Sequence, residues 1–286
     1  MSTTAETTST RPTPGADEIE PRSRTFAEWA QHEPSFRTVL GLRAVILACL
    51  LVAWQLLHAL EVGGPGTIPS VPGVVRELAA VTTEAGFASV LWQTVGPWLL
   101  GLVIVVVGGV AIGVVLGTFS FAYRSTRATI DFVRSFPPVA VIPLAVLTLG
   151  VSTKLKVVFI VATCIWPMVL QTIVGVRSVD PISRQAARSM RLSWWQAVRW
   201  VVLPATMPYV ATGLRISAVM ALLVTIGVEI LGGVAGLGQS IATFEAAGDV
   251  DTMWGYLLTA MLLGVIVSQG FSRLERFALR WHASQR

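Results

Sequence analysis

Residue types that carry enzyme chemistry are few in this sequence and lie far apart. The three histidines, His32, His58 and His282, are separated by long stretches of chain. Cys49 and Cys164 each lie inside an apolar segment, so the sequence indicates neither a disulfide framework nor a zinc site. A glycine-rich phosphate loop ending in Gly-Lys-Ser or Gly-Lys-Thr is also missing. We therefore expect no catalytic constellation, no resident cofactor or metal, and no nucleotide binding by this chain.

A small set of polar residues and prolines interrupts the apolar stretches, and these residues are candidates for a solute pathway or a gate. A carboxylate at membrane depth is costly unless it is paired or hydrated, so Glu229 is expected to face protein or a pathway rather than lipid. We expect Glu229 to act as a gate or to anchor the following loop, with a snorkelling interfacial carboxylate as the alternative. For the uncharged polar candidates, hydrogen bonding between helices is the alternative role. The full set is Pro137, Pro143, Thr148, Gln171, Thr172, Thr225 and Glu229.

The stretch 180–208 lies between two apolar segments and is too long for a tight connection, yet its composition is not that of a disordered loop. Helical patterning runs on both sides of Arg191 to Ser193, and Pro204 is expected to end the second helix. The pattern predicts a helix-turn-helix outside the bilayer. Ala186 and Ala187 place two small side chains on one face, which suits docking into a groove of a partner.

The same stretch resembles the coupling loop of ABC importer permeases, in which Glu-Ala-Ala precedes a glycine turn and a hydrophobic helix ending in Leu-Pro. Two positions depart from that pattern, since Gln185 replaces the acidic residue and Arg191 replaces the turn glycine. A side chain in a left-handed turn costs about 1–2 kcal/mol. Either the turn has another shape, or Arg191 gains a contact to an ATPase carboxylate, or a second, non-identical permease carries the typical loop. By this resemblance the residues that couple to the ATPase are Gln185, Ala186, Ala187, Arg191, Ser193, Leu203, Pro204 and Pro208.

The resemblance extends over roughly residues 69–281 and is to the nitrate, sulfonate and taurine branch of the binding-protein-dependent importers. It implies an all-α integral membrane protein with the type I ABC importer permease fold and a cytoplasmic coupling helix, in the cell membrane of a prokaryote. The implied partners are ATPase subunits that bind ATP and magnesium, a second permease subunit, identical or homologous, and an extracytoplasmic solute-binding protein. The implied substrate is a small anion such as a sulfonate, nitrate or an aromatic carboxylate. The matching stretches are Pro69 to Pro72, Arg134 to Leu144, Gly150 to Lys154, Gly213 to Arg215, Glu229 and Gly236 to Gly238.

The elements that must position these residues are membrane-spanning helices. Of the 286 residues, 53% are hydrophobic and 13% charged, with a mean hydropathy of +0.69, whereas soluble domains carry roughly 25% charged residues. A short amphipathic stretch is expected around Val74 to Ala80. Apolar runs of about 20 residues predict about six transmembrane helices, at Ala44 to Leu60, Trp92 to Gly117, Ile130 to Leu149, Val157 to Val176, Tyr209 to Leu231 and Met253 to Phe271.

Charge distribution predicts the orientation of the chain in the membrane. Residues 1–36 are polar and carry both charge signs, which predicts a disordered cytoplasmic tail before a transmembrane permease domain at 37–286. An even number of spans places both termini on one side. Of the 21 Lys and Arg residues, only Arg76, Lys154 and Lys156 then fall on the other side, so the positive-inside rule favours cytoplasmic termini. The pI near 9.9 follows from this topology and does not indicate nucleic-acid binding.

Two patterns inside the spans predict how the helices pack. Gly109, Gly113 and Gly117 recur every four residues, so a neighbouring helix can approach closely along that face. The prolines at positions 137, 138 and 143 each remove a backbone donor and are expected to break the third span. Broken backbone at membrane depth is tolerated where it lines a cavity, which makes this span a candidate wall of the pathway.

Two other functional classes are compatible with a polytopic membrane protein. An integral membrane enzyme would need an ionisable cluster at membrane depth, which the sequence does not show. A secondary transporter or channel without ATPase partners is the main alternative, although such carriers usually show internal repeats or several ionisable residues within their spans. Copurification of ATPase subunits would discriminate between these possibilities.

Overall fold

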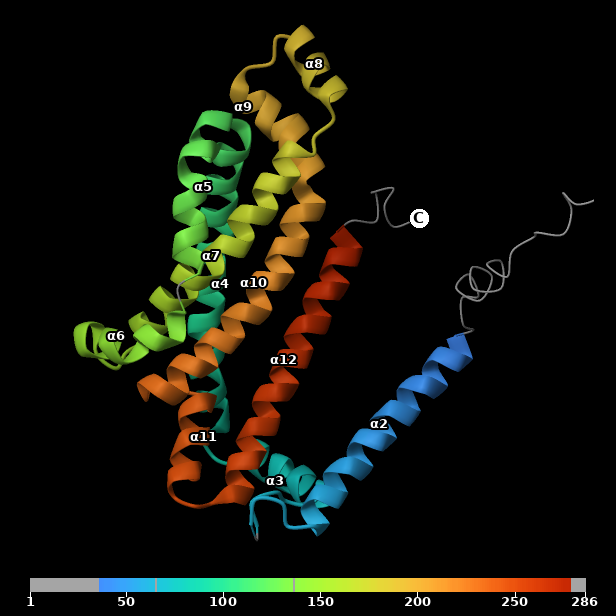
Figure 1. The fold of residues 1–286 in the computed structure, drawn as a ribbon, viewed down its shortest axis with the longest axis vertical. Helices are drawn as coiled ribbons and strands as arrows, with labels where there is room; N and C mark the ends of the chain where they lie inside the picture. The colour runs from blue at the N-terminus through green and yellow to red at the C-terminus, as the bar shows by residue number, and fades with distance from the viewer. Residues whose placement is uncertain (1–35, 65, 136, 279–286) are drawn as a thin grey trace, which may run out of the picture. The chain divides into compact units, whose positions relative to one another are not determined.

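The computed structural model describes residues 36–278 except residues 65 and 136 (Figure 1). The predicted disordered tail lies outside the described residues except for Phe36, where the first helix begins. The chain divides into two compact units, residues 1–54 and 55–286. Within the described residues, the first unit contains the larger part of helix α2 (Phe36–Ala59) and nothing else, and the second contains every site discussed below.

Long apolar helices dominate the described part of the chain, which contains helices and no strand. Five helical stretches there are long and apolar enough to span a membrane, and one bent pair brings the number to six. The single stretches contain α2, α4 (Phe87–Thr118), α7 (Thr153–Arg177), α10 (Leu203–Gly232) and α12 (Val250–Ala278), and the bent pair is α5 (Ser120–Arg134) with α6 (Ile142–Leu149). The predicted all-α class and number of spans are confirmed.

Shorter elements connect the long helices. The amphipathic stretch predicted around Val74 to Ala80 is part of α3 (Val71–Thr83), whose first turn is capped by the side chain of Ser70. A 3-10 turn, η1 (Pro138–Val141), separates α5 from α6. In Figure 1, α8 lies at one end of α7 and α10, whereas α3 and α11 lie at the other end. The remaining connections are α8 (Pro181–Ser189), α9 (Trp194–Ala197), the π-helical turn η2 (Val198–Val202) and α11 (Leu237–Ala246).

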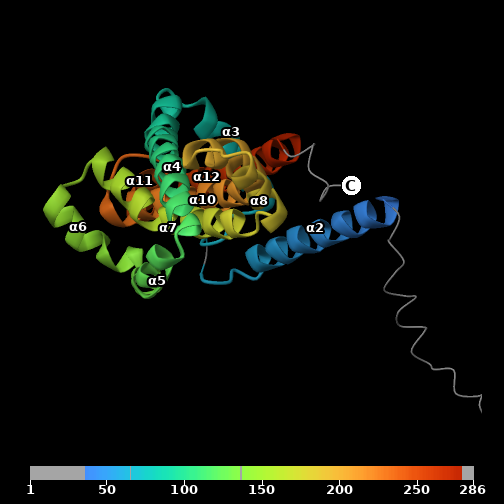
Figure 2. The same ribbon diagram turned by 90° about the horizontal axis from the view of Figure 1, so that it is seen from above.

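The core of the second unit forms where α4, α7 and α10 pack side by side (Figures 1 and 2). A methyl group added to Gly109 would lie 2.7 Å from Cγ of Met168, and one added to Gly117 would lie 2.7 Å from Cβ of Val176. Carbon atoms overlap at these distances, so α4 and α7 are closer than any larger side chain permits. The predicted close approach along Gly109, Gly113 and Gly117 is confirmed.

The third predicted span is a bent pair that begins earlier than expected. Helix α5 starts at Ser120, whereas the prediction started at Ile130, and α6 turns 68° away from it and projects from the bundle (Figure 2). The predicted break is confirmed, with Pro137 preceding η1 and Pro143 in the first turn of α6. The predicted start is wrong because α5 is amphipathic, and a search for apolar runs misses such a helix. Three arginines that the charge distribution places on the cytoplasmic side therefore lie on α5: Arg124, Arg127 and Arg134.

Pro204 does not end the second helix of segment 180–208, which corrects the prediction. The π-helical turn η2 runs directly into α10, and Pro204 lies in the first turn of α10. The N–H of Leu203 donates to the carbonyl of Val198, five residues earlier, and this wider turn makes room for the proline ring. Proline is compatible with the first turn of a helix. The second helix of the segment is consequently continuous with a membrane span.

Candidate functional site

Helix α8 is a short helix fixed by one face to the end of α7. The side chain of Asp180 accepts a hydrogen bond from the N–H of Ile182 and caps the helix. The guanidinium of Arg184 donates to the carbonyl oxygen of Val176 in the last turn of α7. Ala187 is buried, in contrast to its neighbour Ala186, which is exposed. Of the two alanines expected on a docking face, only Ala186 is therefore accessible in the described chain.

The opposite face of α8 is apolar and exposed. Ile182, Ala186 and Met190 are spaced four residues apart, so they lie along one side of the helix. Ile182 is 72% exposed and Met190 is 73% exposed. Large apolar side chains at this exposure, on both sides of a small residue, are typical of a surface that contacts another protein. We call Ile182, Ala186 and Met190 the α8 face.

The turn after α8 has the left-handed shape that a glycine normally supplies. Arg191 has a φ of +54°. Its N–H donates to the carbonyl of Arg188 at 2.9 Å, and the N–H of Leu192 donates to the carbonyl of Ala187 at 3.1 Å. This pair of hydrogen bonds defines the Schellman motif at a helix C-terminus. Of the possibilities left open by the sequence, a turn of another shape is excluded, and Arg191 occupies the strained position.

The second helix of the segment begins at a capping box. The N–H of Gln196 donates to Oγ of Ser193, and the N–H of Ser193 donates to Oε1 of Gln196. Trp194 stacks on Phe119, with ring centroids 6.5 Å apart, and Trp200 is exposed. Exposed tryptophans are enriched at membrane–water boundaries, which indicates that this end of the bundle lies at such a boundary.

The coupling residues predicted from the sequence have different structural positions. Gln185 and Ala186 are exposed on α8, whereas Ala187 is buried. Arg191 and Ser193 shape the turn and the following cap. The remaining three belong to the start of a span and not to the α8 face: Leu203 and Pro204 in the first turn of α10, and Pro208 inside it.

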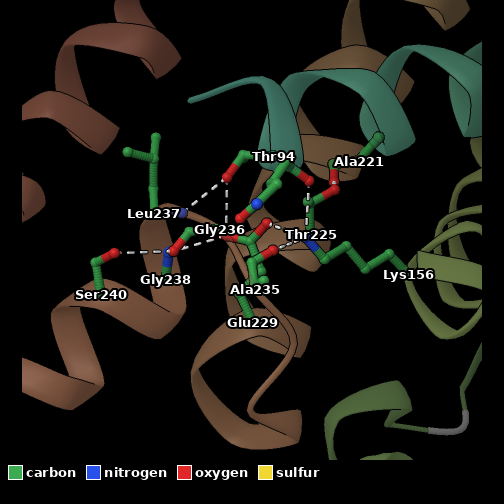
Figure 3. Close-up of polar contacts among 11 residues, drawn as sticks. Thr94, Lys156, Ala221, Thr225, Glu229, Ala235, Gly236, Leu237, Gly238 and Ser240 are labelled. Atoms are coloured by element: carbon green, nitrogen blue, oxygen red, sulfur yellow. Dashed lines mark hydrogen bonds and ion pairs between the residues drawn. The ribbon is translucent and has the colours of Figure 1, made fainter. Parts of the chain in front are cut away.

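A buried ion pair, Lys156 with Glu229, is drawn in Figure 3. Lys156 lies in the first turn of α7 and Glu229 in the last turn of α10, at the ends of these helices that are opposite to α8. Nζ of Lys156 is 2.6 Å from Oε1 of Glu229, and the two side chains are 1% and 0% exposed. The ammonium group also donates to the carbonyl oxygens of Gln93, at 2.8 Å, and Ala235, at 2.5 Å, which uses its three donors. The prediction that Glu229 faces protein rather than lipid is confirmed.

The second carboxylate oxygen of Glu229 holds the start of α11. Oε2 accepts from the N–H of Gly238 at 2.8 Å and from the hydroxyl of Thr94 at 3.1 Å. Oγ1 of Thr94 in turn accepts from the N–H of Leu237 at 2.9 Å. A methyl group on Gly236 would overlap the carboxylate, so the loop passes close to Glu229. This geometry fits the anchoring of the following loop, which is one of the two roles that we expected for Glu229.

Lys156 is the member of this network that sequence reasoning missed. It was assigned to an outer loop, but it lies in α7 and is buried. The available signal was its position next to an apolar run, because ionisable residues at membrane depth tend to pair with one another. Thr94 gave no comparable signal.

A cavity of about 520 Å³ lies between the end of α5, the middle of α7 and α10. Its volume is within the range of small-molecule pockets, roughly 300–1,000 Å³. The predicted pathway residue Gln171 lines it, together with Arg134 and Thr163, which the sequence analysis did not select. The further lining residues used below are Ser135, Trp166 and Met220.

The other predicted pathway residues do not line this cavity. Thr172 and Thr225 are buried, and their hydroxyls donate to the carbonyls of Met168 and Ala221 in their own helices. Thr148 donates to the carbonyl of Ala145 in the same way. Pro137 and Pro143 form the bend between α5 and α6. Among the residues that the structure describes, no group of three or more His, Cys, Asp or Glu side chains could hold a metal ion.

Comparison with known proteins gives consistent matches. A sequence model described as "Binding-protein-dependent transport system inner membrane component" matches residues 109–278. The taurine transport system permease protein TauC of Escherichia coli is 27% identical over 244 residues, covering 82% of this chain and 88% of that protein. The nitrate import permease protein NrtB of Synechocystis sp. is 29% identical over 241 residues, covering 81% of this chain and 86% of that protein.

Solved structures with the same fold are also found. An inward-facing structure of the MetNI methionine ABC transporter matches with a TM-score of 0.57 at 20% identity, over 65% of this chain and 92% of that chain. A crystal structure of an amino acid ABC transporter matches with a TM-score of 0.56 at 18% identity, over 71% of this chain and 97% of that chain. At this level of identity the likeness establishes the fold.

Proposed function

Because the chain belongs to the family of binding-protein-dependent transport system inner membrane components, we propose that it is the permease subunit of an ATP-driven ABC importer for a small anion. The chain is a multi-pass membrane protein, and its family consists of transport permeases. In this proposal it forms the translocation pathway and is not an enzyme. ATP and magnesium are bound by separate ATPase subunits, which carry out hydrolysis.

The α8 face is the observation that supports coupling to those ATPases. It is apolar, exposed and held on the end of α7 by Arg184. Through α9 and η2, segment 180–208 is continuous with α10, so a displacement of α8 can be transmitted to a membrane span. The spans would have an inward-facing and an outward-facing arrangement. Closure of the ATPase pair on α8 would bias this equilibrium, and so would a solute-loaded binding protein at the opposite end of the bundle.

The remaining parts of the proposed complex follow from the family. A second permease subunit, identical or homologous, completes the pathway, and an extracytoplasmic binding protein delivers the solute. With segment 180–208 facing the ATPases, both termini are cytoplasmic. The membrane is the cell membrane of a prokaryote. The strained Arg191 turn is compatible with pairing to a non-identical permease that carries the glycine.

The substrate class is supported by the relatives. Their names assign one to taurine transport and another to nitrate import, and both solutes carry an anionic group. We therefore propose a sulfonate, nitrate or an aromatic carboxylate as the substrate. The negative charge of Glu229 is already neutralised by Lys156, so this carboxylate does not repel an anionic solute.

The test is reconstitution of the chain with the ATPase and binding-protein genes beside it. Proteoliposomes are loaded with ATP or with a non-hydrolysable analogue, and uptake of taurine, nitrate and benzoate is measured. ATP-dependent uptake of at least one anion, together with copurification of the ATPase, is the expected result. Uptake that is driven by an ion gradient and needs no ATPase would show instead a secondary transporter or channel.

A further inference from the structure

Arg134 lies beside the middle of a membrane span. Helices α5 and α7 run antiparallel, and the guanidinium of Arg177, the last residue of α7, lies 3.7 Å from the ring centroid of Tyr123 near the start of α5. Eleven residues further along α5, Arg134 shares a cavity with residues 162–171 of α7. Helix α7 spans residues 153–177, so these residues are at its centre. At about 1.5 Å per residue, Arg134 is roughly 20 Å along α5 from Ser120.

Arg134 ends a stripe of charged side chains on α5. Arg124, Arg127, Asp131 and Arg134 are spaced three and four residues apart, which places them on one helix face, and all are exposed. Oδ1 of Asp131 is 3.3 Å from Nε of Arg134, and Oδ2 is 3.9 Å from Nε of Arg127. One carboxylate cannot neutralise three arginines, so the stripe has a net positive charge. Charged residues at membrane depth face a bundle interior or a water-filled cavity rather than lipid.

The cavity at the end of this stripe offers hydrogen-bond donors. Arg134 and Gln171, whose side chains can both donate, line it. Oγ1 of Thr163 is buried and has no hydrogen-bond partner within the described residues, and an unpartnered buried hydroxyl is costly unless a ligand or water satisfies it. None of the described residues that line the cavity is acidic. This chemistry suits the oxygens of a carboxylate or a sulfonate.

A second cavity of about 430 Å³ adjoins the first and is almost entirely apolar. The two share Val133, Pro138, Ala162 and Thr163 in their walls. The second is otherwise lined by aliphatic and aromatic side chains: Phe132, Val141, Ala145, Leu149, Val158 and Phe159. A polar cavity joined to an apolar one is suited to a solute with a charged head and an apolar body.

We propose that these two cavities form one subsite for an organic anion on the translocation pathway. The carboxylate or sulfonate group binds Arg134, Thr163 and Gln171, and the apolar body lies in the adjoining cavity. Arg127 and Arg124 line the route from the subsite towards the α8 end of the bundle and attract the anion along it. The assignment to a pathway rests on the proposed transport function, but binding at the subsite can be measured without transport.

The first test measures the charge preference of the cavity with a cysteine reporter. Ser135→Cys is introduced into the full chain in membrane vesicles, with Cys49→Ser to remove the exposed thiol; Cys164 is fully buried and stays. Thiol modification by an anionic methanethiosulfonate, the sulfonatoethyl reagent, is compared with modification by the cationic trimethylammonium-ethyl reagent. We expect the ratio of the anionic to the cationic rate to fall about tenfold with Arg134→Gln. Arg273→Gln, which removes an exposed arginine from α12, is the matched control and should leave the ratio unchanged.

The second test measures protection of the same cysteine by added solutes. Benzenesulfonate should slow modification, and its neutral analogue benzenesulfonamide should not. Nitrate, which lacks an apolar body, should protect only at much higher concentration. Protection should be lost with Arg134→Gln and partly restored with Arg134→Lys. Equal protection by the sulfonate and the sulfonamide, no protection by either, or a rate ratio insensitive to Arg134 would overturn the subsite.

These results are separable from the proposed function. Charge-selective, sulfonate-protected modification in a chain that shows no ATP-dependent uptake would refute the importer and leave the subsite standing. ATP-dependent uptake in a chain whose Ser135→Cys reacts without charge preference would refute the subsite alone.

Discussion

Nζ of Lys156 lies 2.6 Å from Oε1 of Glu229, although 73 residues separate the two in the chain. The pair joins α7 to α10, and Thr94 extends the network to α4 and to the first residues of α11. The interaction is buried. A buried pair is stabilising only while both members are present, because removal of one leaves an unpaired charge in the protein.

Glu229→Gln and Lys156→Met should each destabilise the protein by about 3–5 kcal/mol, and the double variant should lose much less than the sum. Thermal unfolding in detergent, followed by size-exclusion fluorescence, gives the three comparisons. Losses that simply add would mean that the two side chains act independently. Transport at the wild-type rate by Glu229→Gln, with an unchanged amount of protein, would disprove a gating role for Glu229.

Ala186→Glu should insert normally and lose coupling. Glutamate is a good helix former, but a packed interface has no room for the added atoms and no partner for the charge. The measurements are copurification of the ATPase and ATP hydrolysis stimulated by the binding protein. Ala186→Ser, which stays small and uncharged, is the control and should remain close to wild type. Unchanged coupling in Ala186→Glu would remove the α8 face from this role.

Arg191→Gly should stabilise the turn after α8 by about 1 kcal/mol, because glycine adopts a positive φ without steric strain. Uptake should stay near normal. Ser189→Gly, at the last residue of α8, is the matched control and should destabilise the helix slightly, by about 0.5 kcal/mol, because glycine loses more conformational freedom on folding. Hydrogen exchange of the α8 amides measures both changes, and it should become slower in Arg191→Gly and faster in Ser189→Gly. If Arg191→Gly abolished assembly, the guanidinium would be shown to make an essential contact with the ATPase.

Gly113→Ala should destabilise the α4–α7 contact, whereas Gly108→Ala should be tolerated. A methyl group on Gly113 would overlap Cβ of Thr172 and lie 3.0 Å from the carbonyl oxygen of Val169, but on Gly108 its nearest neighbour would be 3.6 Å away. Overpacking of this kind costs about 1–3 kcal/mol. Thermal unfolding of the two variants side by side tests the difference. Equal midpoints would show that the helices separate at little energetic cost.

Sequence patterns predicted those spans that can be recognised from a continuous run of neighbouring residues. Long apolar runs identified α4, α7, α10 and α12, because burial in lipid needs only hydropathy and length. The predicted third span began too late in the amphipathic α5 for the same reason, because the arginines of α5 lower its mean hydropathy. Pro204 was interpreted as a stop because the sequence does not show whether a proline lies at the end of one helix or in the first turn of the next.

The candidate site was predicted in part. Glu229 was identified because a lone carboxylate at membrane depth is informative by itself. Its partner Lys156 and the cavity around Arg134 depend on contacts between residues that are distant in sequence, and a single sequence does not contain that information. The family pattern places a glycine where Arg191 stands but left the shape of the turn open, and the φ of +54° shows that the turn is left-handed.

The wide turn at Val198–Val202 contains one residue more than an α-helical turn. Each helical residue advances the chain by about 100° around the helix axis. Removal of one residue from this turn would therefore rotate α9, which directly precedes it, by about that angle relative to α10, and Ser193 and Trp194 would point in a new direction with their identities unchanged. The direction in which α9 leaves α10 is thus encoded in the length of a single turn, so a one-residue deletion there would reorient this connection without changing any of its side chains.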